Sequence, residues 1–223
     1  MDWWQSETLI KFESPTTINV CAPSNSGKTF FTMQLLQNAD GMFKEIPKRI
    51  IYFYSVWQDI YDEMRRTIPN IVFHQHIPTE EEFKDYVTID KFHSICVFDD
   101  LVDEMADSSF IQNVFCVYSH NYNTTIIYMV HNLFQKGKVM RTVSLNTQYF
   151  IIFANHRDKQ QIQHFGRQAF PGKVKYLLAA YQTATSVPFG YLLVDLNAHS
   201  DKQYQLRSKI LPNEDTSVFM VMK

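Results

Sequence analysis

The sequence predicts an α/β fold with a central, mainly parallel β-sheet flanked by helices. Three observations carry this prediction. Short β-branched and aromatic runs alternate with helical stretches along the chain. Several of these runs are apolar throughout, as in strands that are buried on both faces of a sheet. The composition is that of a globular protein, because 45% of the 223 residues are hydrophobic and 20% are charged.

The first half of the chain begins with the β-branched and apolar run Thr16–Ala22, which predicts a strand that a loop and a helix at 29–37 follow. The run Arg49–Tyr54 predicts the second strand, and a helix is expected at 57–66. A short strand is predicted at 71–73. Thr79 and Glu82 have the spacing of a capping box, so we expect another helix to begin there.

The second half begins with Ser94–Asp99, an apolar run that ends in an acid and suits a strand buried on both faces. Further strands are predicted at 125–130, 149–153, 191–195 and 218–222, and helices at 108–118, 158–169 and 173–183. We expect one domain spanning 1–223, with an N-terminal arm at 1–14 and a C-terminal strand-rich extension at 196–223.

Charge is unevenly distributed along the chain. Residues 1–135 carry 9 Lys and Arg against 18 Asp and Glu, whereas residues 136–209 carry 11 against 3. The net charge of −2 therefore does not exclude a polyanionic partner, because one face of the molecule can still be basic.

The sequence also bears on the compartment. No apolar run approaches the ~18 residues of a membrane span, and the start of the chain lacks the features of a signal peptide. Cys21, Cys96 and Cys116 form no C-x-x-C pair, and each lies in an apolar run, which is typical of buried thiols in a reducing compartment. These features predict a soluble intracellular protein with no membrane partner.

A phosphate-binding loop is predicted between the first strand and the first helix. Residues 22–29 read Ala-Pro-Ser-Asn-Ser-Gly-Lys-Thr and match the pattern G-x-x-x-x-G-K-[ST] everywhere but at Ala22. In such a loop, backbone N–H groups surround the phosphates, the lysine reaches the β- and γ-phosphates, and the hydroxyl at the helix start binds Mg²⁺. We therefore expect ATP and Mg²⁺ as cofactors, with ATP held by Pro23, Ser24, Asn25, Ser26, Gly27, Lys28 and Thr29.

Polar residues end two later strands. Asp99 is the last residue of the apolar run 94–99, and a carboxylate buried there needs a cation that neutralises its charge. We expect Asp99 to hold Mg²⁺ together with Thr29, and Asp100 to orient and activate the attacking water. After strand 125–130, Asn132 first and His131 second are candidates for sensing the γ-phosphate or positioning water.

Several further motifs resemble those of a known family. They are Asp99-Asp100-Leu101, Ser119-His120, Ile127–Phe134, Arg141–Asn146, Tyr149–Asp158 and Gly190–Asp195. In this order they resemble the genome-packaging ATPases of Polinton/Maverick elements, adintoviruses and virophages. These are relatives of the poxvirus packaging ATPase in the FtsK–HerA branch of P-loop NTPases. The resemblance runs from about Ser14 to Pro212; Ala22 stands where the family usually has Gly, and His131 where it usually has Gln.

The resemblance implies an ASCE-type P-loop NTPase fold and an ATPase that drives double-stranded DNA into a preformed capsid. It implies a homo-oligomeric ring as the working form and a capsid portal or vertex protein as a partner. The implied location is the host nucleus or a cytoplasmic virus factory, in association with capsids.

Cationic residues outside the loop are candidates for two further roles. Residues 101–135 contain no Lys or Arg, so an arginine finger for the γ-phosphate has to come from elsewhere. Arg141, Arg157 and Arg167 are the candidates, and ring ATPases of the kind that the chain resembles supply such a finger across a subunit boundary.

A packaging motor holds DNA by its phosphates, without reading sequence. The candidates for this contact are Lys136 and Lys138, in a predicted loop around Gly137, and Lys173 and Lys175, after Pro171-Gly172.

Two other functions compete with the packaging motor. One is a small-molecule P-loop kinase, against which the pair Asp99-Asp100 argues, because a kinase does not need an acid that activates water. ADP release that depends on a metabolite distinguishes this kinase. The other is a degenerate, non-hydrolysing DNA-binding relative, which measurable ATP turnover eliminates.

Overall fold

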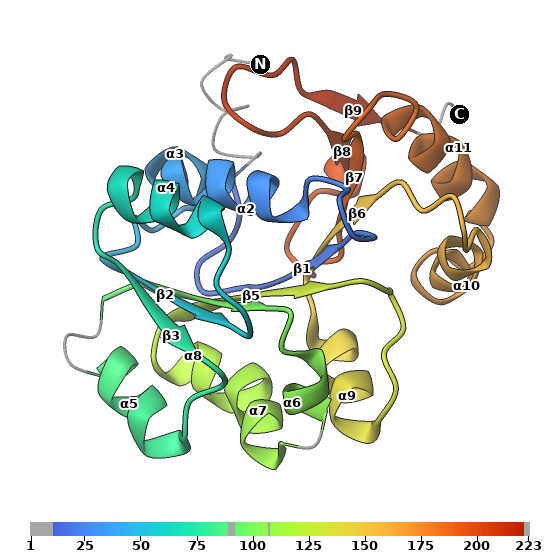
Figure 1. The fold of residues 1–223 in the computed structure, drawn as a ribbon. Coiled ribbons are helices and arrows are strands. Elements are labelled where there is room, and N and C mark those ends of the chain that lie inside the picture. The colour runs from blue at the N-terminus through green and yellow to red at the C-terminus, as the bar shows by residue number, and fades with distance from the viewer. Residues whose placement is uncertain (1–10, 89–91, 107, 221–223) are drawn as a thin grey trace.

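The computed structural model describes residues 11–88, 92–106 and 108–220 and places its strands in one nine-stranded sheet (Figure 1). The order across the sheet is β3-β2-β4-β5-β1-β6-β7-β8-β9. The strands are β1 (Thr17–Cys21), β2 (Arg49–Tyr54), β3 (Ile71–Gln75), β4 (Ser94–Asp99), β5 (Thr124–Val130), β6 (Tyr149–Phe153), β7 (Tyr191–Asp195), β8 (Leu206–Ser208) and β9 (Ser217–Phe219). Pairing is parallel from β3 to β6 and antiparallel from β6 to β9.

Helices cover both faces of the sheet (Figure 1). One face carries α2 (Lys28–Gln37), α3 (Ala39–Met42) and α4 (Asp59–Thr67). The other carries α5 (Glu80–Thr88), α6 (Val102–Ala106), α7 (Ser109–Asn113), the π-helical turn η1 (Val114–Tyr118), α8 (Ser119–Asn121) and α9 (Lys138–Asn146). Two more helices, α10 (Gln160–Ala169) and α11 (Val174–Ala184), pack into the same apolar cluster as this second layer, and the short 3-10 helix η2 (Lys202–Tyr204) precedes β8.

Each face of the sheet has its own apolar core, as the alternation of β4 shows. Ile95 and Val97 belong to the cluster beneath α2 and α4, whereas Cys96 and Phe98 belong to the cluster on the opposite face. Successive side chains of a strand point to opposite faces, so β4 is buried on both, as predicted. Cys21 is also buried, and burial raises the pKa of its thiol to about 12, which keeps it protonated.

The predicted strands at 49–54, 94–99, 149–153 and 191–195 are confirmed to the residue. Sequence reasoning missed the short helices α3, α6, α8 and η2, the helix α9 and the strand β8. It was also wrong about Lys138, which was predicted in a loop but begins α9. Gly137, with φ of 100°, precedes this helix and lets the chain turn into it. The helix predicted at 108–118 changes to a π-helical turn from Val114 onward.

Parts of two predicted segments lie outside the described residues. These are residues 1–10 of the predicted N-terminal arm, 1–14, and residues 221 and 222 of the predicted final strand. The strand itself is found at Ser217–Phe219, where it pairs with β8. Among the described residues, none of the helices has both the length and the apolar character that crossing a bilayer requires.

Candidate active site

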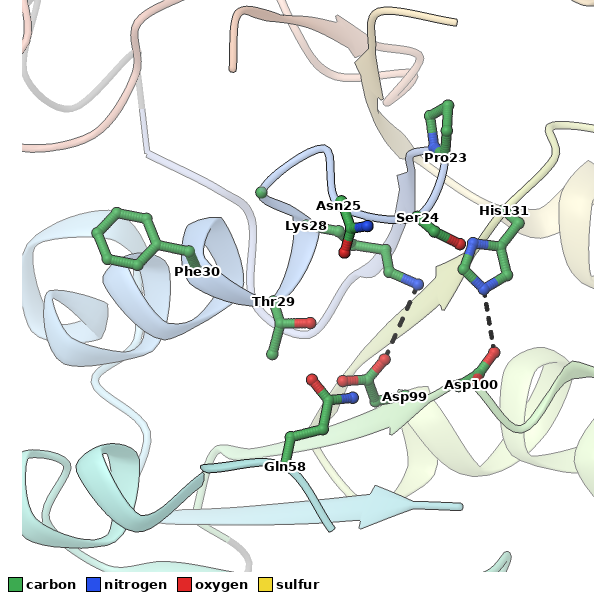
Figure 2. A pocket seen from close by; sticks show the side chains of 11 residues that line it. Pro23, Ser24, Asn25, Lys28, Thr29, Phe30, Gln58, Asp99, Asp100 and His131 are labelled. Atoms are coloured by element: carbon green, nitrogen blue, oxygen red, sulfur yellow. Dashed lines mark hydrogen bonds and ion pairs between the residues drawn. The ribbon is translucent and has the colours of Figure 1, made fainter. Parts of the chain in front are cut away.

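A pocket of about 320 Å³ opens where β1, β4 and β5 end on the same edge of the sheet (Figure 2). The carboxyl ends of parallel strands meet on one edge, so loops that are distant in the sequence converge there. The lining side chains come from the loop before α2, the start of α2, the residue before α4, and the ends of β4 and β5. They are Pro23, Ser24, Asn25, Gly27, Lys28, Thr29, Phe30, Gln58, Asp99, Asp100 and His131.

The loop before α2 has the backbone of a phosphate cradle. Asn25 and Gly27 both have a positive φ, of 61° and 87°. The φ of Gly27 favours glycine, and a Cβ there would stand only 3.0 Å from the ring of Phe189, so a side chain would also require this ring to shift. No side chain caps the N-terminus of α2, and the first N–H groups of a helix have no intrahelical acceptor, so they remain available to an anion.

Ala22 fits the loop without strain, although the motif usually has glycine there. It is fully buried at the end of β1 and is not among the residues with a positive φ. Its N–H donates to the carbonyl of Val130 over 3.0 Å, which ties the start of the loop to β5. A methyl side chain is therefore compatible with this first position.

The pair of Lys28 and Asp99 forms the buried floor of the pocket. Lys28 Nζ lies 3.9 Å from Asp99 Oδ1, and the two residues are 8% and 1% exposed. The other carboxylate oxygen, Oδ2, accepts hydrogen bonds from the hydroxyls of Tyr52 (2.7 Å) and Tyr61 (2.9 Å). Burial, and then the charge of Asp99, raises the pKa of both tyrosines, so both remain neutral donors near neutral pH.

Sequence reasoning missed Tyr52 and Tyr61. Tyr52 lies on β2, beside β4, and Tyr61 lies on α4. The sequence offers one signal for Tyr52. A buried tyrosine hydroxyl needs a hydrogen-bond partner, and the apolar run Arg49–Tyr54 supplies none next to Tyr52 in the sequence. The two hydroxyls leave Oδ1 of Asp99 facing Lys28 and the pocket.

We expect Tyr61→Phe to lower the free energy of unfolding by about 1.5–3 kcal/mol, because it removes a hydrogen bond to a buried carboxylate. Urea denaturation measures this effect. Tyr54→Phe is the matched control, because Tyr54 packs against Tyr61 but its hydroxyl is not a donor to Asp99. Equal losses in the two variants would show that the hydrogen bond does not stabilise Asp99.

Asp100 turns away from the line of β4 and stands at the mouth of the pocket. Its φ of 57° is in the left-handed region, which is uncommon for residues other than glycine but best tolerated by Asn and Asp. Its Oδ1 lies 3.2 Å from Nε2 of His131. The other ring nitrogen of His131, Nδ1, lies 3.3 Å from the carbonyl oxygen of Ala22. The carbonyl oxygen and the carboxylate oxygen both accept, so the ring of His131 lies between two acceptors, one at the end of β1 and one at the end of β4.

Asn132 does not line the pocket. Its Oδ1 accepts a hydrogen bond from Nε2 of Gln161 on α10 over 3.1 Å. The backbone N–H of Leu133 donates to the same glutamine side chain over 2.8 Å. Of the two candidate sensors, His131 therefore faces the pocket and Asn132 faces α10. Gln58, which the sequence did not single out, lines the pocket from the residue before α4.

The remaining candidates are exposed and stand apart from the pocket lining. Arg141 lies on α9, Arg157 in the loop after β6, and Arg167 on α10. Lys136 precedes α9 and Lys138 begins it, whereas Lys173 precedes α11 and Lys175 lies in its first turn. The structure thus brings Asp99, Asp100, His131 and the predicted loop residues other than Ser26 together around the pocket, and leaves these seven cations on the surface. Ser26 lines a neighbouring cavity instead.

Two solved structures share the fold. One is the genome packaging NTPase B204 of Sulfolobus turreted icosahedral virus 2, in complex with ATPγS. It has a TM-score of 0.53 and 9% identity, and the match covers 94% of this chain and 98% of that one. The other is B204, the DNA-packaging ATPase of Sulfolobus turreted icosahedral virus, with a TM-score of 0.58, 10% identity, and coverage of 94% and 99%.

These likenesses concern the fold and confirm the predicted class: a mainly parallel α/β sheet with helices on both faces. Neither the protein-family models nor the curated proteins match the sequence.

Proposed function

We propose that this chain is an ATP-hydrolysing motor that moves double-stranded viral or transposon DNA into capsids. One observation carries the proposal: a phosphate loop, a buried Lys28–Asp99 pair and the exposed acid Asp100 converge on one pocket. The fold shared with two viral packaging ATPases supports the same reading. The motif resemblance to the Polinton, adintovirus and virophage proteins supports the kind of genome element.

The residues present fit ATP and Mg²⁺. Positive φ angles at Asn25 and Gly27 shape the loop around a phosphate, and the uncapped start of α2 offers further N–H donors. Lys28 supplies a positive charge to the β- and γ-phosphates. Thr29 and Asp99 would hold Mg²⁺, which neutralises phosphate charge when it is bound. Hard oxygen ligands of this kind, a hydroxyl and a carboxylate, are those that Mg²⁺ prefers.

Asp100 is the proposed base. It accepts the proton of a water molecule whose oxygen bonds to the γ-phosphorus, while the bond from that phosphorus to the β–γ bridging oxygen breaks. The products are ADP and inorganic phosphate. His131, held by the carbonyl of Ala22, orients the Asp100 carboxylate through their 3.2 Å contact. Asn132 is left with the role of linking the end of β5 to α10 through Gln161.

The working form is proposed to be a homo-oligomeric ring that docks on a capsid portal or vertex protein. Arg141, Arg157 and Arg167 are exposed and do not line the pocket of their own chain, which suits a finger that a neighbouring subunit supplies. The setting that follows for such a motor is the host nucleus or a cytoplasmic virus factory.

The DNA path is proposed to pass the exposed lysines Lys136, Lys138, Lys173 and Lys175. Lys136 and Lys138 flank Gly137 in the segment that leads from β5 into α9. This segment begins at His131, so a change at the pocket can be transmitted along it to the DNA. The region 136–209 supplies the positive charge that the N-terminal part of the chain lacks.

We expect Lys136→Ala combined with Lys138→Ala to weaken binding of all duplex sequences about equally. The slope of log affinity against log salt should flatten by roughly one unit for each DNA phosphate that the variant no longer neutralises. Basal ATP hydrolysis should survive, while its stimulation by DNA should fall. The matched control is Lys44→Ala with Lys48→Ala, two exposed lysines before β2, at the opposite edge of the sheet. An unchanged slope and unchanged stimulation would move the DNA path away from this segment.

A further inference from the structure

A second cavity, of about 410 Å³, lies beside the phosphate loop on the side of β6. Its walls come from the loop itself, from the end of β6, and from the segment 185–190 that joins α11 to β7. Asn25 lines both this cavity and the phosphate pocket, so the two are neighbours across the loop. The proposed function leaves this cavity without a role.

Phe189 is the unusual residue of the cavity. It is 70% exposed, although it is a large apolar side chain. Its φ of 59° is in the left-handed region, a rare conformation for a bulky residue that persists only where the surroundings impose it. Its ring stands against Gly27, whose missing Cβ makes room for it.

The segment around Phe189 is held in place by its own hydrogen bonds. Thr185 Oγ1 donates to the carbonyl of Tyr181 over 2.7 Å, and Ser186 Oγ donates to that of Thr183 over 2.8 Å. The N–H of Gly190 donates to the carbonyl of Val187 over 3.0 Å, and a Cβ on Gly190 would collide with the carbonyl of Ala184. The aromatic ring is thus presented to solvent by a fixed turn rather than by a loose loop.

The position of the cavity fits one end of a nucleotide. Asp99 and Asp100 lie on the side of the phosphate loop where the γ-phosphate reacts. The nucleobase, at the other end of the nucleotide, therefore has to extend from the loop in another direction. The cavity offers a flat aromatic face at Phe189, apolar walls at Val187 and Pro188, and polar groups at Ser186 and His156. A flat aromatic ring with polar edges is the chemistry that such a site accepts.

We propose that this cavity receives the nucleobase of the bound nucleotide, with the base stacked on Phe189. The inference rests on the proposed function, because it assumes that the phosphate pocket takes a triphosphate. The alternative platform is Phe30, which is 57% exposed and lines the phosphate pocket from the first turn of α2.

The test compares Mg·ATP with Mg·tripolyphosphate, which has the phosphates but no base, as ligands in calorimetric titration. Phe189→Ala should weaken ATP binding about 10- to 100-fold, the usual worth of a stacked base, and leave tripolyphosphate binding unchanged. Phe189→Trp, which keeps an aromatic face, should bind ATP as the wild type does. Phe92→Ala removes a similarly exposed ring before β4, at the far edge of the sheet, and should change neither affinity.

Three results would overturn the inference alone, given a wild-type protein that binds both ligands. One is an unchanged ATP affinity in Phe189→Ala. Another is an equal loss of both ligands, which would mean that the ring only supports the phosphate loop at Gly27. The third is a loss selective for ATP in Phe30→Ala in place of Phe189→Ala. A wild-type protein that binds neither ligand would overturn the proposed function itself, and the nucleobase site with it.

Discussion

Replacing the arginine finger with alanine is expected to lower ATP turnover by ~10³–10⁵-fold, because the guanidinium stabilises charge on the transferring phosphoryl group. Arg141, Arg157 and Arg167 are the three candidates to substitute one at a time. All three are exposed, and residues 101–135, which follow the two pocket acids in the sequence, contain no Lys or Arg. Arg66→Ala on α4, an exposed arginine on the opposite face of the sheet, serves as the control and should turn over ATP normally.

Mixing experiments separate a finger that acts in its own subunit from one that acts on a neighbour. An Arg→Ala protein mixed with an Asp100→Asn protein forms some interfaces that pair an intact finger with an intact base. Hydrolysis should therefore reappear in the mixture for the true finger. No recovery with any of the three arginines, in rings shown to exchange subunits, would falsify the assignment to a neighbouring subunit.

Asp100→Asn is expected to bind ATP normally and to lose ~10²–10⁴-fold in turnover, the usual contribution of a positioned base. The change is suited to the site, because asparagine tolerates the left-handed backbone at φ 57° and keeps the shape of the side chain. Single-turnover hydrolysis measures the effect, with nucleotide affinity measured beside it.

Asp103→Asn on α6 provides the matched control for Asp100→Asn. Glu104 is less suited, because its carboxylate already contacts His76 and the N–H of Ile77. Normal hydrolysis by Asp100→Asn, with a loss in Asp103→Asn, would transfer the role of base to Asp103.

The parts of the site that the sequence predicted are those that lie together in the sequence. The phosphate loop is one unbroken segment whose spacing fixes its geometry. Asp99 ends a strand whose apolar character marks it as central, and Asp100 follows that strand. Parallel strands end on the same edge of the sheet, so the loop and the end of β4 lie close together there. The contact between Lys28 and Asp99 therefore follows from the topology.

Contacts that depend on side-chain direction or on distant segments were not predictable in the same way. Asn132 and His131 are adjacent in one turn, and only the backbone there decides which faces the pocket. Tyr61 approaches Asp99 from α4, and Phe189 approaches Gly27 from the far end of the chain. No spacing rule connects such pairs, because packing of whole elements determines them.

The first residues of α9 show a third kind of limit. Lys136, Gly137 and Lys138 read as a loop because the glycine dominates the local pattern. In the structure, Gly137 with its positive φ is the residue before a helix, and Met140 and Val143 bury the inner face of that helix. Tertiary packing thus overrides the local signal there.

Binding of Mg·ATP in the pocket through Lys28 underlies every role proposed above. Calorimetric titration of Mg·ATP into the wild-type protein and into Lys28→Met tests this binding most directly. Methionine keeps the buried aliphatic stem and removes the charge, while Tyr52 and Tyr61 still donate to Asp99, so the variant should fold. We expect saturable binding by the wild type and none by Lys28→Met at the same concentrations. Undiminished affinity in a folded Lys28→Met protein, or no binding by the wild type, would contradict the account.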